Sequence, residues 1–274
     1  PEDRETGLPP GFEPVAQLFR SSTTSVWRAR RGRDGRPVTL KMTNGASDAA
    51  QAQGYRYEYE LLKALDLNST PRILDCLEWG RSAALVFEAL EGSLSLRQVL
   101  TEGRLDLERA LTIGANVARA LAEVHAKRVV HKDIKPGNIL VDASGTARII
   151  DFAIATQIRC ERIEAAPPSR LEGSLLYIAP EQTGRMNRAV DHRADLYALG
   201  ATLYEMLCGH PPFRREALSD SSLVHAHIAR RPPPVPGIPE AVDRVVQKLL
   251  CKNPDERYFS AEGLAQDLER CVTL

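Results

Sequence analysis

Residues 129–142, VVHKDIKPGNILVD, place a dense group of polar side chains between two apolar runs. Four of these side chains fall within eight residues: His131, Asp133, Lys135 and Asn138. The valines before them and the ILV run after them indicate a loop whose two ends are anchored in a hydrophobic core. Taken alone, the polar residues fit either an ordinary charged turn or the working part of an enzyme.

The composition narrows the functional class. The 274 residues fit one or two domains, and 43% of them are hydrophobic, which is enough for a sizeable core. Lys and Arg total 36, as do Asp and Glu, so the formal net charge is zero and gives no support to a nucleic-acid partner. No apolar run approaches the roughly 20 residues that span a bilayer, so we expect no membrane insertion.

The N-terminus and the cysteines bear on the compartment. The first residues, PEDRETGLPPGFE, are acidic and contain prolines, unlike a secretory signal. The five cysteines are scattered without a Cys-x-x-Cys pair, which argues against a zinc site and fits reduced thiols. We therefore expect a cytoplasmic protein.

The first ninety residues read as strand-rich. Residues 25–31 and 37–42 are expected to be strands on either side of a turn at Asp34 and Gly35, which is a hairpin signal. Three further elements are expected in this part: a helix over 49–65 and strands over 72–80 and 83–90.

The rest of the chain is predicted to be mainly helical. Apolar residues recur at three- and four-residue steps over 105–125, with Asp106 as the cap. Residues 195–208 are apolar nearly all round, which indicates a buried helix, and Gly209 ends it. Amphipathic helices are expected over 240–252 and 260–274. Strands followed by helices indicate an α+β fold, with a ligand-binding cleft near residues 88–92.

Two further motifs give the polar loop a context. HKDIKPGNIL is followed by DFA at 151–153 and APE at 179–181, and this order resembles the protein kinase family. The resemblance covers about residues 12–272. It implies a bilobal kinase-like fold, with a tail over 1–11, a small β-rich N-lobe over about 12–90 and a larger helical C-lobe over about 91–274.

The resemblance assigns chemistry to the polar loop. Phosphoryl transfer from ATP needs a positioned hydroxyl, cations on the phosphates and fixed metal ligands. Asp133 would accept or orient the hydroxyl, and Lys135 would contact the transferred phosphate. Asn138 and Asp151 would offer oxygen ligands, which suit Mg²⁺. An ordinary turn is the competing interpretation, and Asp151 and Glu181 at matching positions weaken it.

The nucleotide site is expected to involve the first ninety residues. By resemblance, Lys41 pairs with the α- and β-phosphates and Glu58 holds that lysine, whereas Glu60 would lie on another helix face. Without the other motifs, a solvated Lys and Glu would be the better interpretation. The resemblance also assigns four more residues to ATP binding: Val26, Glu88, Leu90 and Leu140.

Other residues are expected to act indirectly. Glu181 and Arg257 resemble an ion pair that braces the substrate-binding segment, and Asp195 resembles the residue that hydrogen-bonds the catalytic loop. His131 is expected to pack in the core. Two serines are candidate phosphorylation sites, Ser169 and Ser174, and Ser174 also matches a residue near the bound substrate.

The run EQTGRMNR at 181–188 narrows the resemblance. It is similar to bacterial kinase modules fused to large ATPase and sensor proteins of the hybrid histidine kinase type, so further domains of the same polypeptide are expected partners. Arg185 and Arg188 could bind an anion, although a solvated loop is favoured. RRPPPVPGIP, at 230–239, fits a rigid connector better than a polyproline ligand.

The sequence departs from the family pattern in three places. Phe19, Ser21 and Thr24 stand where the phosphate-binding loop usually has glycines, so we expect weaker ATP binding. Ala153 replaces the glycine of DFG, at a cost of about 1 kcal/mol wherever a positive φ is needed. Lys132 replaces an arginine, which predicts weaker control by phosphorylation of the activation segment.

Three functions remain open at this stage. The first is an ATP- and Mg²⁺-dependent serine/threonine kinase acting on a protein substrate, which Lys135 favours by its position two residues after Asp133. The second is a pseudokinase that binds nucleotide or docks proteins within a larger signalling protein, as the altered glycine loop suggests. The third, phosphotransfer to a small molecule, is disfavoured by the APE motif.

Overall fold

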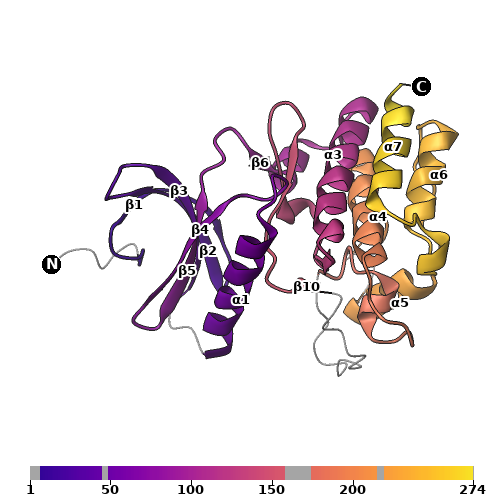
Figure 1. Ribbon diagram of the computed structural model, residues 1–274. Helices are drawn as coiled ribbons and strands as arrows, with labels where there is room; N and C mark the ends of the chain where they lie inside the picture. The colour runs from indigo at the N-terminus through magenta and orange to yellow at the C-terminus, as the bar shows by residue number, and fades with distance from the viewer. Residues whose placement is uncertain (1–6, 45–48, 158–173, 215–218, 274) are drawn as a thin grey trace. The chain divides into compact units, whose positions relative to one another are not determined.

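The computed structural model describes residues 7–44, 49–157, 174–214 and 219–273. The chain divides into two compact units, Pro1–Glu91 and Gly92–Leu274. Figure 1 shows strands concentrated in the first unit and helices in the second. This is the α+β arrangement expected from the sequence.

The first unit is built on an antiparallel sheet with strand order β1-β2-β3-β5-β4. Its strands are β1 (Phe12–Arg20), β2 (Thr24–Arg31), β3 (Pro37–Thr43), β4 (Ile73–Trp79) and β5 (Ser82–Glu88). The predicted hairpin is confirmed, since β2 and β3 pair directly and Gly35 takes a φ of 67° in the turn between them.

Alternation along the strands gives the sheet two different faces. On one face, Ala29, Val38 and Leu40 are buried in a small core. On the other face, Leu85 packs with Tyr55 of helix α1, which spans Ala49–Leu65 as predicted. Lys41 lies opposite Leu85 in the β3–β5 register, so it belongs to the face that α1 covers.

The second unit combines short strands with helices. Its strands are β6 (Leu94–Ser95), β7 (Val129–Val130), β8 (Ile139–Val141), β9 (Ala147–Ile149) and β10 (Thr156–Gln157). They form a three-stranded sheet, β6-β8-β9, and a β10-β7 pair. Its helices are α2 (Leu96–Val99), α3 (Leu107–Ala126), α4 (Arg193–Cys208), α5 (Asp220–Ala229), α6 (Glu240–Leu249) and α7 (Ala261–Val272).

Helix α4 forms the centre of this unit, as its sequence predicts. Residues 194–207 are all buried, and the helix ends at Gly209, whose φ of 78° is left-handed. A Cβ on Gly200 would lie 2.6 Å from the Cβ of Leu249, so glycine lets α6 approach α4 closely. Helix α3 contacts both α4 and α7, and α3 begins at Asp106, which accepts a 2.8 Å hydrogen bond from Arg109 N.

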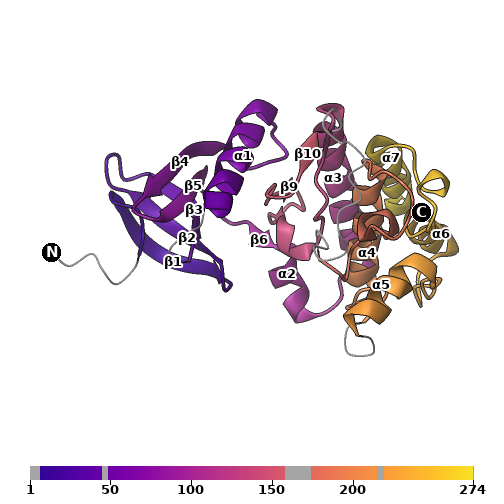
Figure 2. The same ribbon diagram turned by 90° about the horizontal axis from the view of Figure 1, so that it is seen from below.

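Two sequence expectations are refined by the structure. Helix α5 was not predicted, because residues 220–229 carry no clear amphipathic pattern, and it lies beside α4 in both views (Figure 1 and Figure 2). The proline-rich residues 230–239 connect α5 to α6, as the connector interpretation predicts. Among the described residues, no helix is long and apolar enough to cross a membrane.

Candidate active site

The polar loop is anchored at both ends, as its flanking sequence predicts. The residues of β7 are fully buried, and Ile139 and Val141 of β8 are buried after the loop. His131 is also fully buried. Its Nε2 donates to the Ile150 carbonyl oxygen at 3.1 Å, and its ring meets Phe152 edge-on at 4.6 Å. His131 is therefore part of the core that supports the loop.

Asp133 is held by several neighbours. Lys135 Nζ lies 2.6 Å from Asp133 Oδ2, and Asn138 Nδ2 donates to both Oδ2 and the backbone oxygen of Asp133 at 2.9 Å. The Asp133 amide donates to His131 Nδ1 at 3.2 Å. Side-chain rotation would break several of these bonds, so the carboxylate is preorganised, and the adjacent ammonium compensates its charge.

A second segment reaches the same carboxylate. The Ser174 amide donates to Asp133 Oδ1 at 3.0 Å, and Lys135 Nζ donates to Ser174 Oγ at 2.8 Å. Residues 174–177 form a turn, closed by a 2.9 Å bond from Tyr177 N to the Ser174 oxygen. We call this segment the 174–177 turn. Ser174 thus lies beside Asp133, predicted to orient the hydroxyl, and Lys135, predicted to contact the transferred phosphate. Ser169 lies outside the described residues.

The other end of the 174–177 turn is fixed by charges that sequence reasoning missed. The Tyr177 hydroxyl donates to Glu205 Oε2 and accepts from Arg97 Nη2, both at 2.5 Å, and Arg97 Nη1 donates to Glu205 Oε1 at 2.9 Å. Burial and the Glu205 carboxylate raise the pKa of Tyr177, so it stays a neutral donor. The sequence feature that could have indicated this cluster is Glu205, a lone glutamate inside the apolar helix α4.

The Asp195 carboxylate holds the backbone of the polar loop in place through hydrogen bonds. It is fully buried, and its carboxylate accepts hydrogen bonds from the amides of His131 at 2.8 Å and Lys132 at 2.7 Å. Burial acts to raise its pKa, but a 2.9 Å bond from His125 Nε2 and the nearby histidines hold the pKa below its ordinary value. These bonds stabilise the left-handed φ of 69° at Lys132.

Glu181 and Arg257 form a buried, two-pronged ion pair. Their N–O distances are 2.7 and 2.9 Å, and neither side chain is more than 1% exposed. Arg257 also donates to the backbone oxygens of three residues: Cys251, Arg193 and Lys252. Its donors are therefore well satisfied, as a buried charge requires.

Asp151 follows β9, as expected from the sequence, and the residue before it is hydrogen-bonded to Asn138. The Ile150 amide donates to the Asn138 backbone oxygen at 3.0 Å. The left-handed backbone falls on Asp151, with a φ of 69°, and not on Ala153. The penalty expected at Ala153 therefore does not arise in this conformation.

The oxygen atoms of this segment suit a hard divalent cation. The Asn138 side chain bonds Asp133 through Nδ2, which leaves its Oδ1 oriented away from Asp133 as an acceptor. The Asp151 carboxylate is the second candidate ligand. Oxygen donors of this kind fit Mg²⁺ better than a soft metal. Across the described ranges, no cluster of three His, Cys, Asp or Glu residues could hold a metal ion by itself.

In the first unit, Lys41 is paired with Glu58. Lys41 Nζ lies 2.7 and 2.9 Å from the two carboxylate oxygens of Glu58, which is 1% exposed, whereas Glu60 is exposed. The lysine also lies 5.8 Å from the centre of the Tyr55 ring. Val26 is the cross-strand partner of Lys41, so both residues belong to the same face of the sheet.

The turn between β1 and β2 is closed by side chains in place of glycines. Ser21 Oγ accepts from the Thr24 amide at 3.0 Å and lies 3.2 Å from the Thr24 oxygen. Asn44 Nδ2 donates to the Ser21 oxygen at 2.7 Å. Phe19 is 54% exposed. The Ser21 hydroxyl and the Thr24 amide are thus engaged within the turn, and the weaker ATP binding expected from the sequence stays a prediction.

The remaining residues that are predicted to bind nucleotide are Glu88, Leu90 and Leu140. The Glu88 amide donates to the Arg72 oxygen at 3.0 Å, and Glu88 Oε1 accepts from the Arg72 amide at 3.1 Å. Leu90 follows the end of β5, and Leu140 lies half-buried in β8, opposite Arg148.

The basic residues of the 181–188 run do not share one role. Arg188 Nη1 donates to Asn253 Oδ1 at 2.7 Å, and Arg188 also pairs with Asp255, which accepts a 2.6 Å bond from Arg193. Arg188 is exposed, as the favoured solvated-loop interpretation expects, and these contacts also tie it to residues 253–255. Arg185 is exposed.

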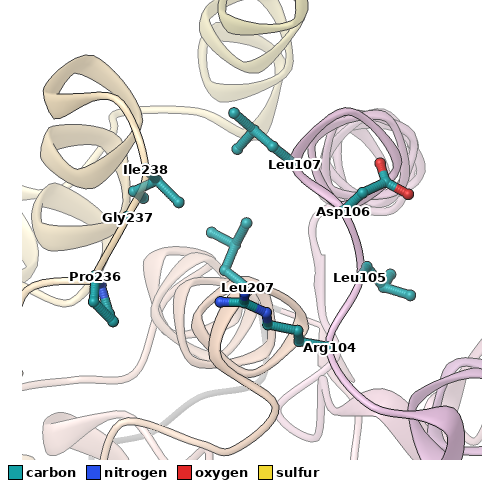
Figure 3. Close-up of a pocket in the computed structure, with 8 residues that line it drawn as sticks. All are labelled: Arg104, Leu105, Asp106, Leu107, Leu207, Pro236, Gly237 and Ile238. Carbon is teal, nitrogen blue, oxygen red and sulfur yellow. The ribbon is translucent and has the colours of Figure 1, made fainter.

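A cavity of about 350 Å³ lies elsewhere in the second unit. It is lined by Arg104, Leu105, Asp106, Leu107, Leu207, Pro236, Gly237 and Ile238 (Figure 3). None of the candidate site residues lines it, so the cavity is separate from the polar loop and the 174–177 turn.

Comparison with known proteins agrees with this geometry. The chain matches the protein kinase domain family over residues 12–268, and it belongs to that family. It is 34% identical over 261 residues to the DNA damage-responsive serine/threonine-protein kinase RqkA of Deinococcus radiodurans, covering 93% of this chain and 38% of that protein. It is 32% identical over 261 residues to serine/threonine-protein kinase PknB of Mycobacterium tuberculosis, covering 90% of this chain and 40% of PknB. The chain therefore spans about two-fifths of the length of these curated relatives.

Proposed function

We propose that this chain is the catalytic domain of a bacterial serine/threonine kinase, which transfers the γ-phosphoryl group of ATP to a protein hydroxyl. The observation that carries the proposal is the Asp133 carboxylate, fixed by Lys135, Asn138 and the Ser174 amide. The similarity to named serine/threonine-protein kinases supports the same activity.

Each of the site residues has a separate role in the proposed reaction. Asp133 orients the acceptor hydroxyl and takes its proton as the oxygen–phosphorus bond forms and the bond from the γ-phosphorus to the departing ADP breaks. Lys135 compensates the negative charge of the transferred phosphoryl group. Lys41, held by Glu58, supplies a cation for the other phosphates of ATP. Asp195 acts indirectly, by fixing the backbone from which Asp133 projects.

A divalent cation completes the proposed site. Asn138 Oδ1 and the Asp151 carboxylate would hold it, and we infer Mg²⁺ from the hardness of these oxygen ligands. Such an ion neutralises charge on the ATP phosphates when bound. The left-handed backbone of Asp151 sets the direction in which its carboxylate is presented.

A pseudokinase is the second candidate, and one observation favours it. The Ser21 hydroxyl and the Thr24 amide satisfy each other in the β1–β2 turn, so they are less available to phosphates. Weak nucleotide binding without transfer would follow if this turn dominated. The intact arrangement around Asp133 supports catalysis.

Transfer of labelled phosphate to generic protein substrates tests the proposal. Asp133→Asn keeps the size of the side chain but removes the base and one of its two acceptor oxygens, so we expect a loss of about 10²- to 10⁴-fold. Equal signals from the wild type and Asp133→Asn would overturn the enzyme assignment. A thermal-shift titration with ATP, with and without Mg²⁺, tests nucleotide binding separately and would identify a pseudokinase that binds but does not transfer.

We also propose that this domain works within a larger cytoplasmic signalling protein that carries ATPase and sensor regions. The EQTGRMNR run supports this, and the curated relatives are much longer than this chain. An antibody raised against the domain should detect, in the soluble fraction of the source cells, a polypeptide far larger than 30.2 kDa. A band at the mass of the isolated domain would contradict the proposal.

A further inference from the structure

A chain of three polar side chains crosses the core of the second unit behind the 174–177 turn. Tyr197 of α4 and His227 of α5 are both fully buried, and Lys252 follows α6. Lys252 Nζ lies 3.3 Å from the Tyr197 hydroxyl, which lies 2.9 Å from His227 Nδ1. None of these residues contributes to the site described above. Buried polar groups of this kind are costly unless they are hydrogen-bonded.

The chemistry of the donors fixes the direction of the chain. An ammonium group can only donate, so the Tyr197 oxygen accepts from Lys252 and its own proton is donated to His227 Nδ1. Burial and the nearby Lys252 ammonium lower the pKa of His227 to about 3, so the ring is neutral at physiological pH. A neutral ring that accepts at Nδ1 carries its proton at Nε2. Lys252 and Tyr197 thereby select one tautomer of His227.

The His227 end of this hydrogen-bonded series lies near the 174–177 turn. His227 Nε2 is buried, with no hydrogen bond of good geometry among the described residues. The backbone groups that bear on this ring are those of Leu175 and Leu176, and they favour a proton on it. Both leucines also pack on the apolar cluster of Phe213, Leu223 and Ala226. A buried N–H donor faces the middle of the 174–177 turn, whose first residue contacts Asp133 and Lys135.

We propose that His227 is a positioning residue for the phosphoryl acceptor, with its Nε2–H directed at the backbone carbonyls of Leu175 and Leu176. The bond is long in the unliganded chain but still restrains the turn, and it shortens when a protein substrate loads the turn, because hydrogen bonds at enzyme sites often tighten only in the complex. Lys252 and Tyr197 keep the donor in the required tautomer. This positioning role of His227 rests on the proposed kinase function, since the turn matters only if Asp133 receives a protein hydroxyl.

Plain core packing is the competing explanation, because the His227 ring also meets Phe213 edge-on at 5.0 Å. Matched substitutions separate the two. His227→Gln keeps an N–H donor near the position of Nε2, whereas His227→Leu keeps bulk without any donor. Tyr197→Phe keeps the packing of α4 and removes the hydroxyl that selects the tautomer. Thermal unfolding of each variant establishes that it is folded.

Steady-state kinetics give the first readout. We expect His227→Leu to lower kcat/KM for a protein substrate by about tenfold, the value of one hydrogen bond, while KM for ATP changes little. His227→Gln should recover most of that loss, and Tyr197→Phe should fall between them. Equal losses in the Leu and Gln variants, or a parallel change in both KM values, would overturn the proposal in favour of packing.

Hydrogen exchange gives a readout that does not depend on catalysis. In a folded His227→Leu variant, amides of residues 174–177 should exchange about tenfold faster, with those of α3 unchanged. His227→Gln should exchange like the wild type. If the wild type transfers no phosphate but this exchange pattern holds, the kinase function fails and the positioning of the turn stands. If the wild type is active and exchange at the turn is unaltered, the positioning role is wrong.

Discussion

Arg97 and Glu205 are 108 residues apart in sequence, yet the Arg97 guanidinium lies 2.9 Å from the Glu205 carboxylate, and the two share the Tyr177 hydroxyl. Glu205 is buried, whereas the Arg97 side chain is 49% exposed. A single charged cluster therefore ties together α2, the last turn of α4 and the 174–177 turn. The turn that contacts Asp133 depends on a cation outside every recognised motif.

Removing Arg97 should destabilise the second unit moderately. Arg97→Ala leaves Glu205 with Tyr177 alone, and we expect a loss of about 1–2 kcal/mol, less than for a fully buried pair because Arg97 is half-exposed. The measurement is urea unfolding of Arg97→Ala, Glu205→Gln and the double variant. A non-additive cycle is expected, since the two side chains touch; losses that simply add would show that the pair is not coupled.

The Glu181–Arg257 pair should be far more sensitive. Neither side chain is more than 1% exposed, so Glu181→Gln leaves a buried, poorly compensated guanidinium at a cost of roughly 3–5 kcal/mol. The exposed pair of Arg244 and Glu240 is the matched control, where Arg244→Ala should cost about 0.5 kcal/mol or less. Denaturant midpoints of both variants check this. Similar shifts in the two would contradict a special role for burial.

Lys252 predicts a pH effect of defined sign. Burial and the nearby Arg257 lower its pKa from 10.5 to about 8, so the unfolded chain binds more protons between these values. The contribution of Lys252 to the free energy of unfolding must therefore rise as the pH increases from about 8 toward 10.5. Wild type and Lys252→Met, unfolded in urea at several pH values, should diverge in favour of the wild type over this range. Parallel curves would show that Lys252 has an ordinary pKa in the folded chain.

Glu58 should affect nucleotide use through Lys41. Glu58→Gln removes the charge that holds Lys41 Nζ at 2.7 Å, and we expect KM for ATP to rise about tenfold as the ammonium loses its position. Glu60→Gln, on an exposed position two residues later, is the control and should leave KM for ATP unchanged. Initial rates at varied ATP concentration decide the matter, and equal effects at the two positions would contradict the assignment.

Much of this arrangement could be predicted because it is local in sequence. The Asp34–Gly35 hairpin, α1 over residues 49–65 and the buried helix α4 follow from turn residues and apolar periodicity. The short motif around Asp133 similarly predicts a polar loop between buried anchors. Contacts between distant parts of the chain that involve no family motif could not be predicted. The Arg97 cluster and the His227 chain arise only when α2, α4 and α5 are packed.

Backbone conformation was the second feature that could not be predicted from the sequence. The sequence placed the strain of the DFA motif at Ala153, whereas the left-handed residue is Asp151. A pattern of residue types shows where glycine is missing, but it does not show which neighbour adopts the unusual φ. Helix α5 was missed for a related reason, since its buried face mixes Leu223 with the polar His227.

The clasp formed by Ser21, Thr24 and Asn44 has a thermodynamic consequence for ligand binding. A glycine-rich turn must give up many conformations when it closes on phosphates, whereas this turn has already lost them on folding. Fewer direct contacts are thereby partly offset by a smaller entropic penalty. Nucleotide binding at this turn should accordingly be weak in enthalpy yet little opposed by ordering of the backbone.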